Sequence, residues 1–349
     1  MANALIRMFV DFAEHGDGVR MMRILVFGAG AIGGLVGARM LSAGLEVAFH
    51  DLAPVLEALR RDGLSLTEPD GTVLRLAPAC IATGLDGYGP GDVVLLAVKA
   101  QQIGGALDDL ARALRGGATL VTLQNGLPWW YFQCARGPHA GRPLRSLDPT
   151  GAIGAAVDPQ RILGCVAYPA AEVLAPGQVK RIEGDRFPVG EPVGGASARA
   201  AAVADAFARA GFKSPVLDDV RAEIWLKAWG NLAFNPVSAL TGMTMAQICG
   251  FAPTRELVTR MMLEAQEIAG RLGISFRVPL QRRLEGAGKV GAHKTSMLQD
   301  REAGRALEID AILGAVIELG RLTGAATGCL EAVYALTRAI DPGAGRAGT

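Results

Sequence analysis

Short apolar runs alternate with amphipathic stretches along the first part of the chain. Runs rich in Val, Leu, Ile and Phe stand at 23–27, 46–50, 93–98 and 118–123, and they predict buried strands. Segments with helical apolar spacing lie between them at 35–42, 55–61 and 106–114. A hairpin is predicted over 64–76, where Pro69-Asp70-Gly71 supplies a turn. Strands that alternate with helices predict a parallel, doubly wound sheet in an α/β domain.

The pattern changes twice further along. Residues 134–162 contain many Gly, Pro and Arg with few periodic apolar positions, which predicts an irregular segment. Strand-like pieces follow at 163–168 and 178–190, with a helix near 197–211. Long helical patterns then cover 219–249, 254–272, 277–289, 301–323 and 328–340. We predict an N-terminal extension at 1–20, an α/β domain over 21–217 and an all-helical domain over 218–345.

Composition and charge exclude several classes. The 349 residues are 50% hydrophobic and 20% charged with a net charge of +1, as expected of an ordinary globular protein. We therefore expect no nucleic-acid partner and, since no apolar run reaches membrane-spanning length, no membrane span. The five cysteines are scattered without a C-x-x-C pair, so we expect a cytoplasmic protein. No His, Asp and Glu cluster has metal-ligand spacing, and we expect no metal.

A glycine-rich loop follows the first predicted strand and opens a helix. It comprises Gly28, Ala29, Gly30, Ala31, Ile32 and Gly33, the G-x-G-x-x-G spacing of dinucleotide-binding loops. The first glycine permits a tight turn, the second lets a pyrophosphate approach the backbone, and the third lets helix and strand pack. This context predicts that 21–217 is a Rossmann-type domain with a nicotinamide cofactor.

Asp51 ends the second predicted strand and allows two interpretations. A carboxylate there binds a ribose 2′-hydroxyl and repels a 2′-phosphate, which favours NAD(H) over NADP(H). Alternatively, Asp51 is the N-cap of the following helix, since Asp is a good capping residue.

Three more polar residues follow predicted strands on the cofactor-facing edge of the sheet. Lys99, with Gln102 close behind, could meet a phosphate or the adenine, or Lys99 could be a solvated lysine. Asn125-Gly126 could fix the nicotinamide or ribose, or form a plain Asn-Gly turn.

Residues 221–236 carry the most informative pattern. Lys227, Asn231 and Asn235 are spaced i, i+4, i+8 and form one polar stripe on an otherwise apolar helix. If the stripe is buried, desolvation lowers the pKa of Lys227 toward values useful to a general acid. If it faces solvent, Lys227 extends its ammonium into water.

A second group of candidates lies near the C-terminus. Ser296 and Glu308 belong to the stretches T-S-M-L-Q-D at 295–300 and L-E-I-D at 307–310. On pattern alone, Ser296 is a candidate N-cap for the predicted helix that carries Glu308.

Together these motifs resemble the ketopantoate reductases. Their order is the glycine loop, V-K-A at 98–100, Q-N-G at 124–126, W-L-K-A-x-x-N-x-x-x-N-P at 225–236 and the two later stretches. The resemblance implies reduction of a 2-keto acid with NADP(H), a catalytic lysine at Lys227 and an acidic residue at Glu308. It also places substrate-binding residues at Asn231, Asn235 and Ser296, and cofactor-side residues at Lys99 and Asn125.

The resemblance implies a mechanism, and the chain departs from the family pattern in three places. Hydride attacks the C2 carbonyl of ketopantoate, and Lys227 donates a proton to the alkoxide. The basic residue expected after the second strand is replaced by Asp51-Leu52-Ala53. The segment from Trp129 to 162 is longer than expected, and it could reshape the pocket or form a surface or homodimer contact. The extension at 1–20 has no counterpart in the family.

These departures keep an alternative substrate open, namely another 2-keto acid reduced with NADH. A catalytically inactive nucleotide sensor is disfavoured, because Lys227 and Glu308 are both present. A histidine-based dehydrogenase is also disfavoured, since His15, His50, His139 and His293 show no pairing with a catalytic Asp or Glu.

Overall fold

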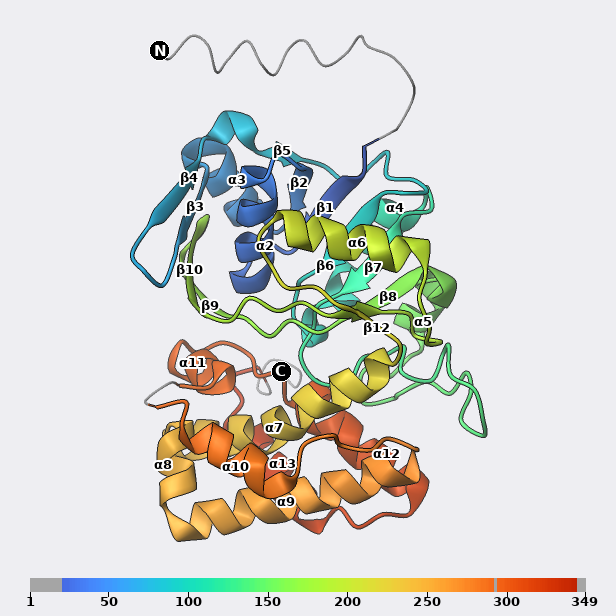
Figure 1. Cartoon of the computed structure of the whole chain (residues 1–349), viewed down its shortest axis with the longest axis vertical. Coiled ribbons are helices and arrows are strands. Elements are labelled where there is room, and N and C mark those ends of the chain that lie inside the picture. The colour runs from blue at the N-terminus through green and yellow to red at the C-terminus, as the bar shows by residue number, and fades with distance from the viewer. Residues whose placement is uncertain (1–20, 292–293, 344–349) are drawn as a thin grey trace.

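The computed structural model describes residues 21–343 except 292–293. The predicted extension at 1–20, His293 and the last predicted residues 344–345 lie outside the described residues. An α/β part and a helical part lie one above the other in Figure 1, joined where the last strand of the sheet gives way to a long helix.

Eight strands in the described residues form the main sheet, in the order β12-β11-β8-β7-β6-β1-β2-β5. They are β1 (Arg23–Phe27), β2 (Glu46–His50), β5 (Ala82–Thr83), β6 (Val93–Leu96), β7 (Thr119–Thr122), β8 (Ile162–Cys165), β11 (Val189–Gly190) and β12 (Val216–Leu217). Neighbouring strands run parallel except β8 and β11, which are antiparallel. The predicted doubly wound sheet is confirmed, with a mixed edge that the sequence did not predict.

Helices cover both faces of this sheet, because the side chains of a buried strand point alternately to its two sides. Ile24 and Val26 of β1 pack in one core cluster with α2 and α6, whereas Leu25 and Phe27 pack in a second cluster with α4. The helices of this part are α2 (Ala31–Ser42), α3 (Ala53–Asp62), α4 (Leu107–Leu114), α5 (Ala152–Ala156) and α6 (Ala198–Arg209).

A second, four-stranded sheet has the order β4-β3-β10-β9. The predicted hairpin is present as antiparallel β3 (Leu64–Thr67) and β4 (Val73–Leu76), but it belongs to this sheet. The sequence missed β9 (Ala170–Ala175), and the strand predicted at 178–190 is wrong as one element. It divides into β10 (Gln178–Glu183), which pairs with β3, and β11 of the main sheet.

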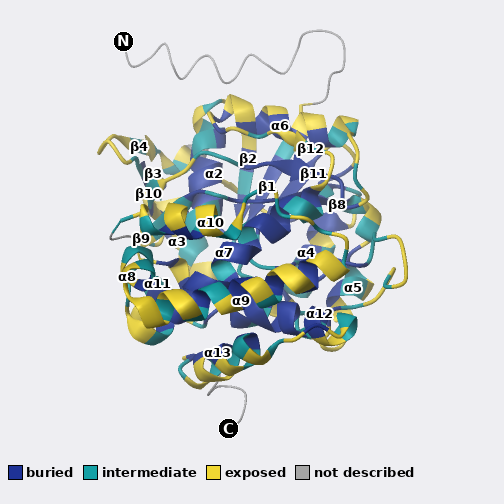
Figure 2. Ribbon diagram, turned by 60° about the horizontal axis from the view of Figure 1, so that its bottom comes forward, coloured by how far each residue is buried: buried dark blue, intermediate teal, exposed yellow. Residues whose placement is uncertain are grey.

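The helical part surrounds one long central helix, α7 (Val220–Thr241), which is largely buried in Figure 2. The helix predicted at 219–249 is wrong as one element. Gly242 (φ 74°) ends α7 in the left-handed conformation, and Thr244 caps α8 (Met245–Gly250). The remaining helices are α9 (Ala252–Arg271), α10 (Leu280–Gly288), α11 (Ser296–Glu302), α12 (Ala315–Thr323) and α13 (Gly328–Ala339).

The helix predicted at 301–323 is also wrong. The chain leaves α11 after Glu302, turns through 303–308 and enters a π-helical segment, Asp310–Gly314, ahead of α12. Glu308 therefore lies just before this segment and is not carried by the helix that begins near Ser296. Thr295 is the N-cap of α11, with its hydroxyl accepting from the Leu298 amide at 3.3 Å, so the capping role predicted for Ser296 is wrong.

The aromatic residues Trp129–Phe132 are buried and join the two parts of the molecule. The indole of Trp225, on α7, donates to the hydroxyl of Tyr131 at 2.7 Å, and the Trp130 indole donates to the Thr122 hydroxyl at 3.2 Å. A surface position for these aromatic side chains is therefore excluded. They form part of the core on which α7 rests.

Candidate active site and cofactor loop

The glycine loop has the geometry that the sequence predicts. Gly28 (φ 104°) donates its amide to the His50 carbonyl at 2.8 Å, and a Cβ on Gly33 would lie 1.8 Å from the Gly28 carbonyl oxygen. A Cβ on Gly30 would meet no atom within 4 Å. Gly30 precedes α2, whose first turn has no acidic residue and no side-chain cap. The open space and the free helix amides fit the pyrophosphate of a dinucleotide.

Asp51 holds this loop from the end of β2. Its carboxylate accepts from the Ala29 amide and from the Leu52 amide, both at 2.6 Å. The N-cap of α3 is Leu52, without a side-chain cap bond, so the capping role considered for Asp51 is wrong. The carboxylate lies against the loop that would face the cofactor.

Asn125 lies at the centre of the candidate active site. Its side-chain oxygen accepts from Lys227 Nζ at 2.6 Å, and its amide nitrogen donates to Glu308 Oε2 at 3.4 Å. The turn is fixed by Gly126 (φ 80°), where a Cβ would lie 2.1 Å from the Ala311 carbonyl oxygen of the π-helical segment. The close packing of this turn therefore brings Asn125 and Glu308 together.

Lys227 is partly buried on α7 and its ammonium donates to Asn125, so the solvent-facing interpretation of its stripe is wrong for this side chain. Its ammonium also donates to the Ala167 carbonyl, at the end of the segment that follows β8. Burial lowers the pKa of Lys227 to about 8, and the charge of Glu308 opposes that shift. The ammonium therefore gives up its proton more readily than a solvated lysine does.

Glu308 is buried, with 8% of its surface exposed. This burial raises the pKa of its carboxyl group above the ordinary value. The nearby charge of Lys99 and hydrogen bonds from the Ala100 amide (3.2 Å) and from Asn125 oppose this shift. Lys227 and Glu308 are thus shifted in opposite directions, each toward its neutral form, and Asn125 connects them.

Lys99 and Gln102 lie at the rim of this site. Lys99 Nζ pairs with Asp300 Oδ2 of α11 at 2.5 Å, so it is not a solvated lysine. Gln102 accepts from the Lys99 backbone amide at 2.9 Å and fixes the local turn. Their predicted contacts with a cofactor stay predictions.

Three predicted substrate residues have no side-chain hydrogen bond to another described residue. Asn231 and Asn235 follow Lys227 along α7, with Asn235 buried at 6% exposure, while Ser296 is exposed at the start of α11. Polar side chains without protein partners are free to bind a ligand.

The sequence missed a charged cluster one helical turn before Lys227. The buried carboxylate of Glu223 accepts from the Tyr168 hydroxyl at 2.8 Å, from Arg186 at 2.7 Å and from Arg277 at 2.7 Å. An acid at i−4 from Lys227 was a signal in the sequence, but its partners come from three distant segments. A small cavity beside this region is lined by Gln124, Gly126, Cys165, Val166, Ile224, Lys227 and Ala228.

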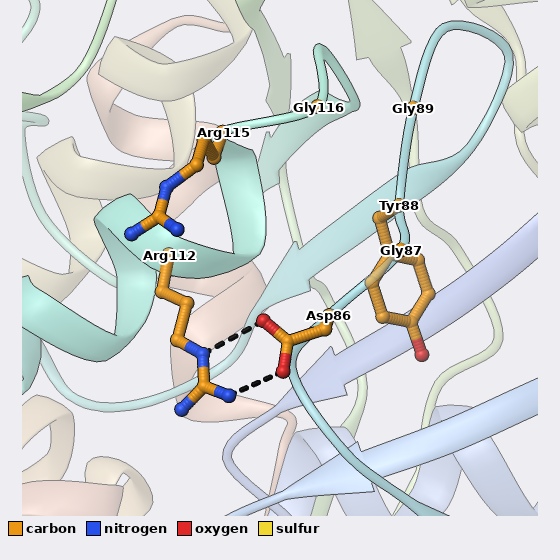
Figure 3. Close-up of a pocket in the computed structure, with 7 residues that line it drawn as sticks. All are labelled: Asp86, Gly87, Tyr88, Gly89, Arg112, Arg115 and Gly116. Carbon is orange, nitrogen blue, oxygen red and sulfur yellow. Dashed lines mark hydrogen bonds and ion pairs between the residues drawn. The ribbon is translucent and has the colours of Figure 1, made fainter.

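A larger hollow lies elsewhere, around the loop from Asp86 to Gly89 (Figure 3). Its main polar feature is a two-point ion pair between Arg112 of α4 and Asp86, with Arg112 Nε 2.7 Å from Asp86 Oδ1. This hollow faces the amino ends of β6 and β7, whereas α/β sheets bind ligands at the carboxyl ends. We therefore centre the candidate active site on Lys227.

Two broader features concern the described residues only. None of their helices is long and apolar enough to cross a membrane. No group of three or more His, Cys, Asp or Glu side chains among them is arranged to hold a metal ion.

Comparison with known proteins identifies the family. Residues 24–136 match the family model for ketopantoate reductase PanE/ApbA, and residues 219–341 match the model of its C-terminal domain. A relative from Mesorhizobium japonicum, named 2-dehydropantoate 2-reductase, is 48% identical over 320 residues, which cover 91% of this chain and 98% of the relative.

Solved structures agree in fold. A crystal structure from Ralstonia solanacearum MolK2, assigned as a ketopantoate reductase, has a TM-score of 0.86 and 36% identity, covering 92% of this chain and 98% of that one. The structure of D-mandelate dehydrogenase with NADH and anilino(oxo)acetate has a TM-score of 0.77 at 22% identity, covering 93% and 100%, and shares the fold. The two family models and the extensive identity show that the chain belongs to the ketopantoate reductase family.

Proposed function

We propose that the protein reduces ketopantoate (2-dehydropantoate) to pantoate. The observation that carries the proposal is the hydrogen-bonded arrangement of Lys227 on α7, Asn125 after β7 and Glu308 before the π-helical segment. A bound nicotinamide cofactor supplies the hydride for the C2 carbonyl carbon. Lys227 acts as general acid and gives its proton to the oxygen that becomes the C2 hydroxyl.

The surroundings of Lys227 support this role. A pKa of about 8 leaves most of the ammonium protonated at neutral pH and lowers the free energy of proton release. The bond to Asn125 directs Nζ, and Glu308 orients Asn125 from the other side. Glu308 also accepts from the terminal hydroxyl of the substrate, while Asn231, Asn235 and Ser296 bind its carboxylate and hydroxyl oxygens.

For the cofactor, the family resemblance favours NADP(H), but the residues after β2 support NADH. The Asp51 carboxylate at the end of β2 bonds to the glycine loop, and a 2′-phosphate bound beside it would bring a second negative charge. Leu52 is 73% exposed and offers no charge. The nearest arginines on α3 have other partners, since Arg60 donates to the Thr83 hydroxyl at 3.0 Å and Arg61 pairs with Asp62. We therefore propose NADH as the preferred cofactor.

The second candidate function is reduction of a different 2-keto acid. The test is steady-state kinetics with ketopantoate and a panel of 2-keto acids, each with NADH and NADPH. The first proposal is supported if kcat/KM for ketopantoate exceeds kcat/KM for every other keto acid. A higher kcat/KM for another keto acid would make that acid the substrate instead. Light scattering on the same sample tests the homodimer, which stays a prediction.

A further inference from the structure

Arg283 of α10 lies flat against α7 beside the proposed active site. If Gly230 carried a Cβ, that atom would lie 2.7 Å from Arg283 Nη2 and 3.4 Å from Cζ and Nε. A glycine within a helix costs about 1 kcal/mol relative to alanine. Here the missing side chain makes the room that the guanidinium occupies.

The Arg283 guanidinium has no hydrogen bond or ion pair to any described residue. Arg186 and Arg277 differ from Arg283 in this respect, since both pair with the carboxylate of Glu223. Arg283 is half-buried, and burial lowers its pKa. A partly desolvated guanidinium without an anionic partner is costly, which suggests that the partner is a ligand.

Arg283 packs on a face of α7 that adjoins the face of Lys227. Gly230 is three residues after Lys227, which corresponds to about 4.5 Å along the helix axis on adjoining faces. Both cations also approach one short segment after β8. The Ala167 carbonyl accepts from Lys227, and the next residue, Tyr168, lies close enough to Arg283 to oppose the lowering of its pKa.

We propose that Arg283 binds the carboxylate of the 2-keto acid and selects for anionic substrates. This inference rests on the proposed function, because it assumes that a keto acid is reduced at Lys227. Ser296, Asn231 and Asn235 are neutral, so they cannot match the substrate's negative charge. Lys99 is paired with Asp300, and Lys227 is assigned to proton donation, so the carboxylate is left to Arg283.

The test compares a charged substrate with its neutral counterpart. The most active keto acid of the panel and its methyl ester are measured with wild type, Arg283→Gln and Arg283→Lys. We expect wild type to prefer the acid by about 100-fold in kcat/KM, the scale of a charge-assisted contact, and Arg283→Gln to prefer it by less than about fivefold. Arg283→Lys should retain part of the preference. The matched control is Arg282→Gln, an exposed neighbour on α10, which should behave as wild type.

A second variant tests the contact without removing the charge. Gly230→Ala should crowd the guanidinium and raise the KM of the keto acid in wild type, but not in the Arg283→Gln background. Unchanged acid preference in folded Arg283→Gln, or a change confined to the KM of the cofactor, overturns the inference while the proposed function stands. A wild-type enzyme that reduces none of the keto acids overturns the proposed function and this inference with it.

Discussion

At the residue scale, the candidate site depends on a neutral amide between two ionisable groups. Asn125 accepts from Lys227 and donates to Glu308, so neither group contacts a full opposite charge directly. A direct ion pair would hold the pKa of Lys227 high and oppose proton release. The amide orients the ammonium while burial keeps its pKa low, which suits a general acid.

Replacing the proposed acid should slow the chemical step. We expect Lys227→Ala to lower kcat by about 100-fold or more, the scale of general-acid catalysis. Steady-state kinetics at saturating substrate, with circular dichroism to check folding, provide the measurement. A folded variant with wild-type kcat would exclude Lys227 as the acid.

The pH dependence follows from the same residue. The reduction needs the protonated ammonium, so kcat/KM should fall as pH rises through about 8, the pKa of Lys227. Asn125→Asp places a carboxylate beside Nζ, which should raise this pKa and move the falling limb to higher pH by about one unit. A limb that stays in place would show that another group controls it.

Asp51 should influence the choice between NADH and NADPH. Asp51→Asn removes the charge that would repel a 2′-phosphate, so the kcat/KM ratio of NADPH to NADH should rise roughly tenfold, about 1.4 kcal/mol. Because Asn retains an oxygen for the Ala29 amide, the loop should keep its position. An unchanged ratio would remove Asp51 from cofactor discrimination.

At the scale of elements, two glycines of one loop serve different purposes. Gly30→Ala has open space for its Cβ, so thermal stability should stay near wild type while cofactor affinity falls by about tenfold or more. Gly33→Ala would drive a Cβ to 1.8 Å from the Gly28 carbonyl oxygen and should destabilise the fold itself. Thermal unfolding and cofactor titration of both variants separate the roles, and equal destabilisation would contradict the assignment.

Sequence patterns predicted elements well where the local signal was complete. The strands at 23–27 and 46–50 and the glycine loop needed only apolar runs and turn residues. The division of 219–249 also has a local cause, since Gly242 is a signal for a helix end and Thr244 for a helix start. The π-helical segment after Glu308 was not, because it depends on packing against the distant Gly126 turn.

At the scale of the whole molecule, polar contacts join the α/β part to the helical part in separate places. Glu223 accepts from Tyr168 and Arg186, and Lys99 pairs with Asp300. Resemblance of motifs predicted Lys227, Asn125 and Glu308 at one site, which the structure brings together. It did not predict these bridging partners, since each contact joins segments that share no local pattern.

The Lys99–Asp300 ion pair joins the α/β part to α11 of the helical part. Lys99 side-chain exposure is 30% and that of Asp300 is 9%, and Asp300 also binds Arg305 at 2.9 Å. A partly exposed pair of this kind contributes modestly, so Lys99→Gln and Asp300→Asn should show a coupling of about 1 kcal/mol in unfolding experiments.

Kinetics of the same two variants separate a bridge from a cofactor contact. If Lys99 only bridges the two parts, both variants should raise the KM of the keto acid by similar factors, because closure positions the substrate. If Lys99 also meets the cofactor, Lys99→Gln alone should raise the KM of the cofactor. We expect the second result, because Ala100, the next residue, donates its amide to Glu308 and so places Lys99 beside the reacting groups. Equal cofactor KM values in both variants and wild type would leave Lys99 as a bridge between the two parts.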